Sequence, residues 1–179
     1  LLRNRAGTRV LLELKRGAST RRVVVTPVNA QREERLRYMD WVERSRETVQ
    51  AQGGGEIGYM HLYAMGADDL ATFVREFYAQ YDRGALIVDV RRNRGGNIDS
   101  WIIEKLLRRS WAFWQKPRGI PYANMQKSFR GHLVVLTDAM TYSDGETFAA
   151  GVKSLGLGPL IGTRTAGAAS SGRAIAGSV

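Results

Sequence analysis

The chain has 179 residues, 44% of them hydrophobic, which fits one medium-sized domain or one domain and a fraction. It contains no cysteine, and this excludes disulfides, thiolate metal sites and cysteine nucleophiles. The net charge of +10 is carried largely by arginines scattered along the chain, a distribution more typical of a solvated surface than of a nucleic-acid groove.

The first residue is leucine, and it precedes a pattern that is already strand-like, so we expect a piece of a longer protein. No apolar run approaches the ~20 residues that a membrane-spanning helix needs, and the first residues lack the apolar core of a signal peptide. We therefore expect a soluble, cytoplasmic piece with neither a membrane nor a nucleic acid as partner.

The N-terminal third predicts a hairpin followed by a helix. Two runs of alternating apolar and polar residues, 10–14 and 23–25, flank a basic turn that contains glycine, which is typical of an antiparallel hairpin. Residues 31–50 place apolar side chains at helical spacing among many charges. The stretch "AQGGGEIG" then marks a boundary, because three consecutive glycines break a helix.

From Ile57 onward the pattern alternates between strands and helices. Near-continuous apolar strands separated by helices indicate an α/β fold with a largely parallel sheet that helices cover on both faces. The expected elements are strand 57–62, helix 68–82, strand "ALIVDV", helix 97–114, an interrupted loop 115–130, strand "HLVVLTD", a helix within 141–156 and strand "PLIG".

Three loops are candidates for a functional site. In open parallel sheets, sites gather beyond the carboxyl ends of the strands, where loops and helix N-termini converge. The loops that follow the predicted strands are "RRNRGGN", "AMTYSDGE" and "TRTAGAASSG". We expect these three loops to lie at one edge of the sheet.

Ser143 has two possible roles in the second loop. Followed three residues later by Glu146, it fits a capping box, in which the serine oxygen accepts a helix amide and the glutamate returns to the cap. A serine at a helix N-terminus also suits a nucleophile, because the helix dipole and the amide of Asp144 stabilise developing negative charge. The position permits both roles.

The first loop carries two glycines, Gly95 and Gly96, where a strand turns toward a helix. Without a Cβ, either residue lets a backbone amide approach a substrate carbonyl and serve as half of an oxyanion hole. The simpler interpretation is a turn before a helix cap at Asn97 or Ser100. The loop lacks the pattern of a phosphate-binding loop. A Gly-Gly loop beside a serine turn indicates acyl-transfer chemistry more strongly than either loop alone.

A serine nucleophile needs a base, and only two histidines are present. His61 alternates with apolar residues along a strand. His132 opens the strand that leads to Ser143, which predicts that it lies at the opposite end of the sheet. Both are expected to be structural, so the chain contains no convincing base.

Carboxylates and aromatic residues offer no clearer site. Asp89, Asp138 and Asp144 lack further ligands at metal spacing, so hydrogen bonding at strand ends and helix capping is the preferred interpretation, and no metal is expected. The aromatic cluster of residues 111–114 with Tyr122 indicates packing at a helix end or the wall of a binding site.

Several stretches in order, "GALIVDVRRNRGGN", "GHLVVLTDAMTYSDGETFAAGVKSLGLG" and "PLIGTRTAG", resemble the catalytic domain of the tricorn protease branch of the tail-specific, C-terminal-processing serine peptidases. The resemblance extends over the whole chain. It implies the last strands of a PDZ-like domain in residues 1–30, a connecting helix and Gly-rich linker in 31–55, and an incomplete catalytic core in 56–179.

The resemblance implies a crotonase- or ClpP-like sheet and an endopeptidase that works through an acyl-enzyme without a metal or cofactor. Ser143 would be the nucleophile, Asp144 would supply one oxyanion-hole amide, and Gly95 or Gly96 would supply the other. The family's base histidine lies before the PDZ domain and its supporting glutamate after the "GTRT" strand, both outside these residues. The isolated chain is therefore expected to be inactive.

The resemblance also implies partners. Peptide substrates released by an upstream protease such as the proteasome are expected, together with a ring-like homo-oligomer that the resemblance implies to be a hexamer.

The resemblance also aligns Trp114 with a position at which archaeal relatives carry an acid that favours basic P1 side chains. A tryptophan there argues against a basic preference and is compatible with an apolar or aromatic P1 pocket.

Two other functions fit parts of the pattern. A catalytically silent scaffold would use the PDZ-like segment and the aromatic cluster to bind peptides. An acyl-CoA enzyme of the crotonase type would share the sheet and the two-amide oxyanion hole without needing a serine nucleophile. Labelling of Ser143 separates the first from a peptidase, and activity that survives its removal would favour the second.

Overall fold

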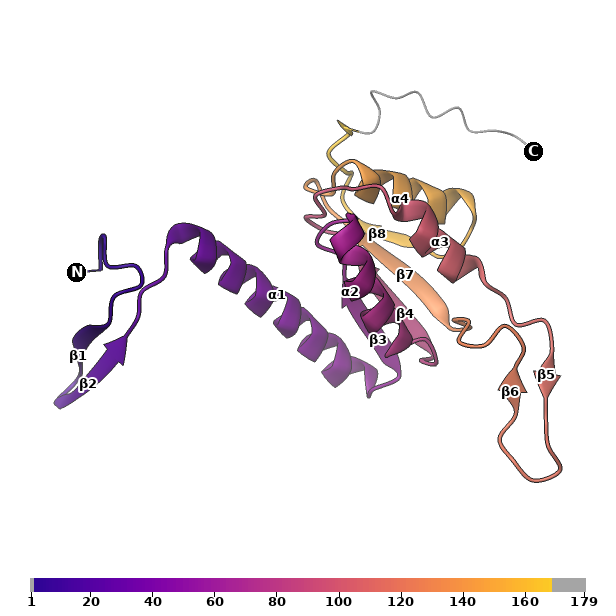
Figure 1. Ribbon diagram of the computed structural model, residues 1–179, viewed down its shortest axis with the longest axis horizontal. Helices are drawn as coiled ribbons and strands as arrows, with labels where there is room; N and C mark the ends of the chain where they lie inside the picture. The colour runs from indigo at the N-terminus through magenta and orange to yellow at the C-terminus, as the bar shows by residue number, and fades with distance from the viewer. Residues whose placement is uncertain (1, 169–179) are drawn as a thin grey trace. The chain divides into compact units, whose positions relative to one another are not determined.

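The computed structural model describes residues 2–168. The chain divides into two compact units, residues 1–45 and 46–179, and the boundary falls inside one long helix. The two units hold separate β-sheets (Figure 1). Within the described residues, no helix is both long enough and apolar enough to cross a membrane.

The first unit contains the predicted antiparallel hairpin. β1 (Val10–Arg16) pairs with β2 (Ser19–Val25), and Arg16 lies opposite Ser19 next to the turn. Gly17 in that turn has a φ of 60°, a conformation that glycine adopts without the steric cost of a Cβ. The alternating pattern and the glycine-containing turn were therefore read correctly.

The long helix α1 (Ala30–Gly53) confirms the predicted helix and extends it slightly. At its start, the side-chain oxygen of Asn29 accepts the Arg32 amide at 2.8 Å, as a helix cap does. At its end, Gly54 and Gly55 take positive φ values of 56° and 84°, which leave the helical conformation. The run of three glycines thus ends the helix, as expected.

The second unit is built on a four-stranded parallel sheet. Its strands are β3 (Ile57–His61), β4 (Ala85–Asp89), β7 (His132–Thr137) and β8 (Leu160–Gly162), in the spatial order β3-β4-β7-β8 (Figure 1). Parallel neighbours need a crossover between them, and a helix supplies each one. The α/β class and the parallel sheet agree with the prediction.

Three helices cover the core side of this sheet: α2 (Ala67–Tyr78), α3 (Asp99–Leu107) and α4 (Asp144–Ser154). Each fully buried aliphatic or aromatic side chain in such a core contributes roughly 1.5–3 kcal/mol. The strands contribute Met60, Leu86, Val88 and Val135 to the core, and the helices contribute Phe73, Phe77, Ile102, Leu106, Phe148 and Val152.

The opposite face of the sheet carries a different set of side chains. Ile87, Val134 and Leu136 are half-buried, and Ile161 is 54% exposed. The register places these residues one position away from the core residues, so they point to the other side. Cover by helices on both faces was predicted, whereas the core cluster of the described residues forms on one.

The helix predicted over 97–114 is wrong in its second half. α3 ends at Leu107, and Arg108 takes the extended conformation with φ −61° and ψ 124°. One turn beyond the last buried leucine the sequence offers Arg109 and Ser110, so a longer helix would have no apolar face to bury. The amphipathic pattern stops where the helix does.

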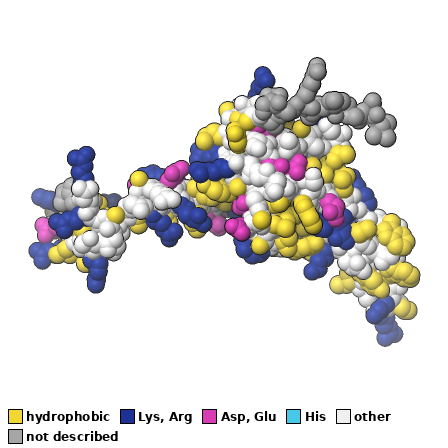
Figure 2. All heavy atoms as spheres, turned by 45° about the horizontal axis from the view of Figure 1, so that its top comes forward, with side chains coloured by type: hydrophobic (Ala, Val, Ile, Leu, Met, Phe, Trp, Pro, Cys, Tyr) yellow, Lys and Arg dark blue, Asp and Glu magenta, His cyan; other side chains and the backbone are white. Residues whose placement is uncertain are grey.

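A short antiparallel hairpin follows in place of the expected helix end and loop. β5 (Phe113–Trp114) pairs with β6 (Tyr122–Ala123). Aromatic residues favour strands over helices, which accounts for the change. Hydrophobic side chains gather over this hairpin in Figure 2, and the exposed ones are Trp111, Phe113, Trp114, Ile120 and Tyr122.

Basic side chains form no single groove on the face shown in Figure 2. Lys and Arg side chains are spread over that face and interspersed with acidic and apolar ones. A nucleic-acid site requires basic residues gathered along one surface. The scatter read from the sequence therefore persists on this face.

Candidate active site

The three predicted loops meet at the carboxyl edge of the four-stranded sheet, the third in residues 163–168, since its residues 169–172 lie outside the described part of the chain. Backbone hydrogen bonds join them: Tyr142 N–H donates to Asn93 O at 3.0 Å, and Ala166 N–H donates to Thr141 O at 3.0 Å. The Thr141 hydroxyl also donates to Val90 O at 2.9 Å. Residues far apart in sequence are thus held together, as the topology predicted.

Ser143 lies at the centre of this edge in an unusual backbone conformation. Its φ of 51° and ψ of −117° are strained for a residue with a Cβ, and such strain is held only where the surroundings determine it. Half of the expected capping box is present, since Ser143 N–H donates to Glu146 Oε2 at 2.9 Å. The Ser143 hydroxyl makes no capping hydrogen bond, and Glu146 N–H donates to Ser143 O instead, at 2.8 Å.

The hydroxyl is therefore left over from the cap. Within residues 2–168 it has no hydrogen-bond partner, and Ser143 is half-buried. The turn that begins α4 is completed by backbone atoms and by Glu146. The backbone of Ser143 takes part in the cap, but its hydroxyl oxygen does not.

Asp144 is the first residue of α4 and links two loops. Its carboxylate accepts the amides of Ile98 and Asp99 at 2.9 and 3.1 Å, so it caps α3 from a distant part of the chain. Burial raises the pKa of this carboxyl, and the nearby Asp99 raises it further, while the two helix amides lower it. The Asp144 backbone N–H makes no hydrogen bond to residues 2–168 and is available at the helix N-terminus.

This cap corrects one prediction. A cap for the following helix was expected at Asn97 or Ser100, the nearest polar residues before and inside it. The N-cap position is Ile98, whose side chain cannot accept a hydrogen bond, and the Asp144 carboxylate takes the cap's place. A cap supplied from 46 residues away has no local sequence signal.

Gly95 lies directly against Ser143. A Cβ on Gly95 would stand 2.7 Å from Ser143 Cβ and 3.3 Å from the Asp144 nitrogen, so no larger residue fits. Its φ of 80° also favours glycine. Its N–H, however, donates to the Asn93 side-chain oxygen at 2.8 Å and is already used.

Gly96 is packed against Met65, in the segment that follows β3. A Cβ on Gly96 would stand 1.8 Å from Met65 O, closer than any atoms tolerate. Met65 N–H donates to Gly95 O and Asn97 N–H donates to Met65 O, each at 2.8 Å. The Gly96 N–H itself has no hydrogen-bond partner in the described part of the chain. Of the two glycines, Gly96 keeps an available amide.

The two histidines are placed differently. His61 ends β3 at the carboxyl edge, is 7% exposed, and its Nε2 lies 2.8 Å from Arg91 O. Burial lowers the pKa of its imidazole, an effect that the bond to Arg91 and the charge of Asp89 reduce. His132 is exposed and pairs with Ala85 at the first position of both strands, which puts it at the opposite end of the sheet, as predicted.

The strand-end carboxylates are engaged in hydrogen bonds, as expected. Asp89 is fully buried, accepts the Tyr59 hydroxyl at 2.8 Å and pairs with Arg91 at 2.6 Å. Asp138 accepts the amides of Arg92 and Met140, each at 3.0 Å. Among the described residues, no three His, Asp or Glu side chains are grouped so that they could hold a metal ion.

Trp114 belongs to a different sheet from the loops. It lies on β5 opposite Tyr122, in the small hairpin that follows α3, and its side chain is 54% exposed. The Gly-Gly loop and the serine turn instead follow strands of the four-stranded sheet. The structure thus unites Ser143, Asp144 and the glycines at one edge and places Trp114 on a separate element.

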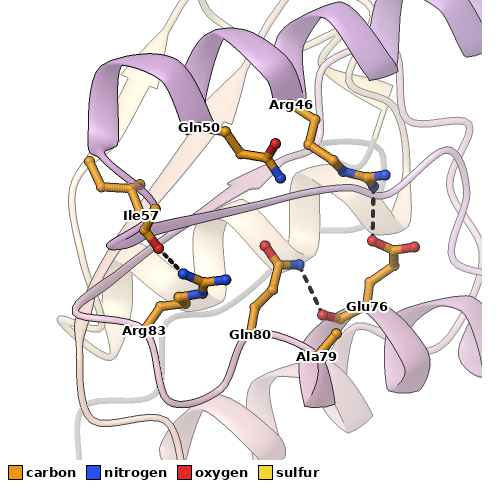
Figure 3. Close-up of a pocket in the computed structure, with 8 residues that line it drawn as sticks. Arg46, Gln50, Ile57, Glu76, Ala79, Gln80 and Arg83 are labelled. Atoms are coloured by element: carbon orange, nitrogen blue, oxygen red, sulfur yellow. Dashed lines mark hydrogen bonds and ion pairs between the residues drawn. The ribbon is translucent and has the colours of Figure 1, made fainter.

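A surface pocket lies at the amino end of β3 (Figure 3). This surface pocket of about 420 Å³ borders the first residue of β3. Arg46 pairs with Glu76 at 2.9 Å, the Gln80 side-chain amide donates to Glu76 O at 2.9 Å, and Arg83 donates to Gly55 O. The charged groups of this pocket are used in contacts within the fold. They therefore indicate a structural contact between α1 and α2 and not a second functional site.

Sequence comparisons connect this arrangement to known proteins. Residues 56–175 match the model of the family described as Peptidase family S41. Tricorn protease homolog 1 of Streptomyces coelicolor is 40% identical over 152 residues, which are 84% of this chain and 14% of that protein. Tricorn protease of Thermoplasma acidophilum is 37% identical over 168 residues, which are 93% of this chain and 16% of that protein.

The fold comparison agrees. A crystal structure of the tricorn protease covers 92% of this chain with a TM-score of 0.74 and 37% sequence identity. The matched region is 16% of that solved chain. The present chain therefore spans only 14% to 16% of the length of these relatives.

Proposed function

Because the chain belongs to peptidase family S41 and is homologous to tricorn proteases, we propose that it is the core of a tricorn-type serine endopeptidase with Ser143 as the nucleophile. One observation carries this proposal. The Ser143 hydroxyl is left out of its own capping box, in a strained turn beside the unpartnered amide of Asp144. A residue that served only as a cap would use its hydroxyl for the cap.

The reaction would follow the course of serine acyl transfer. Ser143 Oγ attacks the scissile carbonyl carbon while a general base takes the hydroxyl proton. The base then gives that proton to the amine nitrogen, the C–N bond breaks, and an acyl-enzyme remains. Water, deprotonated by the same base, attacks the ester and releases the second product.

The oxyanion would be held by two backbone donors. The Asp144 N–H at the start of α4 is one, and the α4 dipole adds to its effect. The Gly96 N–H is the other, because the Gly95 N–H is bonded to Asn93. Removing one such donor typically costs about 100- to 1000-fold in kcat.

The general base would come from outside the 179 residues. His61 is buried against Arg91 O, and His132 lies at the far end of the sheet, so neither suits the task. The resemblance to the family assigns the base to a histidine before the PDZ-like segment 1–30 and a supporting glutamate to a region after the "GTRT" strand. The 179 residues alone are therefore expected to show no turnover.

The substrates would be peptides, including those released by an upstream protease such as the proteasome. The names of the relatives support this assignment. A cytoplasmic, hexameric ring remains a prediction from the same resemblance. Trp114 is proposed as a wall of the P1 pocket, which would favour apolar or aromatic P1 side chains.

The test uses the complete parent protein and its Ser143→Ala variant with a library of fluorogenic peptides. The proposal expects turnover that drops by at least about 10⁴-fold in the variant, since the nucleophile carries the covalent step. Preference for apolar or aromatic P1 residues would support the role of Trp114.

A fluorophosphonate that reacts covalently with activated serines provides the second measurement. Labelling of the wild type at Ser143, and none of the variant, is expected. Folded and assembled wild type that is neither labelled nor active would favour the silent peptide-binding scaffold. Equal activity of both proteins would favour a reaction without a serine nucleophile, as in crotonase-type enzymes.

A further inference from the structure

Asn93 is a fully buried polar residue that the mechanism above does not use. It lies in the loop after β4 and is 0% exposed. Its side-chain nitrogen donates to Leu62 O at 2.6 Å, and its side-chain oxygen accepts the Gly95 N–H at 2.8 Å. A buried amide is tolerated when both of its ends are bonded, and here they are.

Asn93 also contacts the serine turn. Its backbone oxygen accepts the Tyr142 N–H at 3.0 Å. Gly145 lies against its side chain, because a Cβ on Gly145 would stand 2.8 Å from the Asn93 side-chain oxygen. One residue therefore touches the end of β3, the Gly-Gly loop and the first turn of α4.

These contacts fix the direction of the Gly96 amide. Gly95 O faces the segment that follows β3, where it accepts the Met65 N–H at 2.8 Å. The C=O and N–H of a trans peptide point in opposite directions, so the Gly96 N–H points away from Met65. The hydrogen bond from Gly95 to Asn93 holds the preceding peptide group and so prevents rotation of this one.

We propose that Asn93 is the positioning residue of the oxyanion site, holding Gly95 inward so that the Gly96 amide faces the reacting carbonyl. This inference rests on the proposed peptidase function. It assigns to Asn93 no contact with substrate. The alternative is that Asn93 only satisfies the end of β3 and stabilises the fold.

The two roles differ in kinetics. A positioning role acts where charge develops, so Asn93→Ala in the complete parent protein should lower kcat by about 100-fold and leave KM within about threefold. Fluorophosphonate labelling of Ser143 should slow to a similar extent, because it also passes through an oxyanion. Folding and assembly are checked by thermal unfolding and by mass in solution.

Phe77→Leu is the control for lost stability. Phe77 lies on α2, is 1% exposed in the core, and belongs to none of the three loops. The Phe77→Leu substitution should lower the unfolding temperature. Its kcat, calculated per Ser143 that reacts with the fluorophosphonate, should stay at the wild-type value. An equal fall of kcat in both variants, or a normal kcat in Asn93→Ala, would overturn the positioning role.

Asn93→Asp provides a second readout that does not depend on tolerance of alanine. Burial raises the pKa of a carboxyl, so this side chain takes up a proton more readily than an exposed aspartate. Once protonated, it can donate to Leu62 O and accept from Gly95, as the amide does. The labelling rate relative to wild type should therefore rise as the pH falls from 8 to 6.

The outcomes separate this inference from the proposed function. A wild type that is neither active nor labelled removes the function, whatever Asn93 does. An active wild type with a flat rate ratio for Asn93→Asp removes only the role of Asn93. Should Asn93→Ala fail to assemble, the pH dependence of Asn93→Asp decides the question.

Discussion

The two edges of the four-stranded sheet use their polar groups in opposite ways. At the amino edge, the pocket brings Arg46 and Glu76 together as an ion pair within the fold. At the carboxyl edge, side chains bind the loops to one another, yet the Ser143 hydroxyl and the amides of Asp144 and Gly96 have no partner among the described residues. Polar groups left open in a tightly bonded network indicate a surface shaped for a ligand.

The two edges differ in backbone strain. Both edges are held by hydrogen bonds, and at the carboxyl edge these bonds surround Ser143, whose φ of 51° and ψ of −117° are strained for a residue with a Cβ. Strain is retained where the surroundings over-determine it, and such places cluster at functional sites. At the amino edge the polar groups stabilise the fold, whereas at the carboxyl edge some of them stay available to a ligand.

After loss of the Ser143 nucleophile, the largest effect is expected from Gly96→Ala at the carboxyl edge. Its Cβ would meet Met65 O at 1.8 Å, so the loop must shift and the proposed oxyanion donor moves with it. Peptidase activity of the complete protein should fall by about 100- to 1000-fold. Steady-state kinetics with the best library peptide measures this loss.

Gly54→Ala is the matched control before β3. Gly54 also has a positive φ, 56°, but an added Cβ would meet no atom within 4 Å. A cost of about 1 kcal/mol in stability is expected, with kcat unchanged. Comparable losses of activity in the two alanine variants would show that glycine geometry matters for the fold alone.

A smaller effect is expected on the pH dependence of stability, to which His61 should contribute and His132 should not. Burial lowers the pKa of His61, so the folded protein binds its proton only at a lower pH than the unfolded chain does. Stability is fully present above the unfolded value of 6.5 and is lost as the pH falls from there toward the folded pKa. His61→Gln should lose less stability than wild type between pH 7 and pH 5.

Hydrogen exchange of β3 and β4 amides in the complete protein, corrected for the intrinsic effect of pH, measures this difference. His132→Gln is the control, because His132 is exposed at the opposite end of the sheet. It should follow the wild-type profile. If His61→Gln follows that profile as well, burial of His61 contributes nothing to the acid sensitivity of this sheet.

The smallest effect is expected at the amino edge. Glu76→Gln keeps the shape of the side chain but removes the ion pair with Arg46. The side chains of Glu76 and Arg46 are 23% and 28% exposed. Partly exposed pairs contribute little, so the loss should be about 0.5–1 kcal/mol. Chemical unfolding detects it, and turnover should not change. A large loss of activity would mean that the amino edge also contributes to the reaction.

Much of the fold could be predicted from the sequence because its signals are local. The alternating run before Gly17, the glycines after α1 and the apolar strands from Ile57 onward each determine their own element. The hairpin at Phe113 was missed because the helical pattern was extended past Leu107, although the next turn offered no apolar face.

The meeting of the loops at one edge was predicted, whereas the contacts within them were not. The loops and Ser143 followed from strand ends and from the resemblance. The sequence could not decide between Gly95 and Gly96, because that depends on which amide Asn93 binds. Nor could it show that Asp144 caps α3, since that contact joins residues 46 apart. An asparagine inside a glycine-rich loop was the one signal that could have drawn attention to Asn93.

The long-range contacts at this edge also order events in folding. The bonds from Ile98 to Asp144 and from Thr141 to Val90 join residues 46 and 51 apart, so both wait until β4 and β7 have paired. Only then can the turn at Ser143 be held in its strained form. A nascent or half-folded chain contains Ser143 but not the geometry of its turn, so the proposed active site forms only after the sheet.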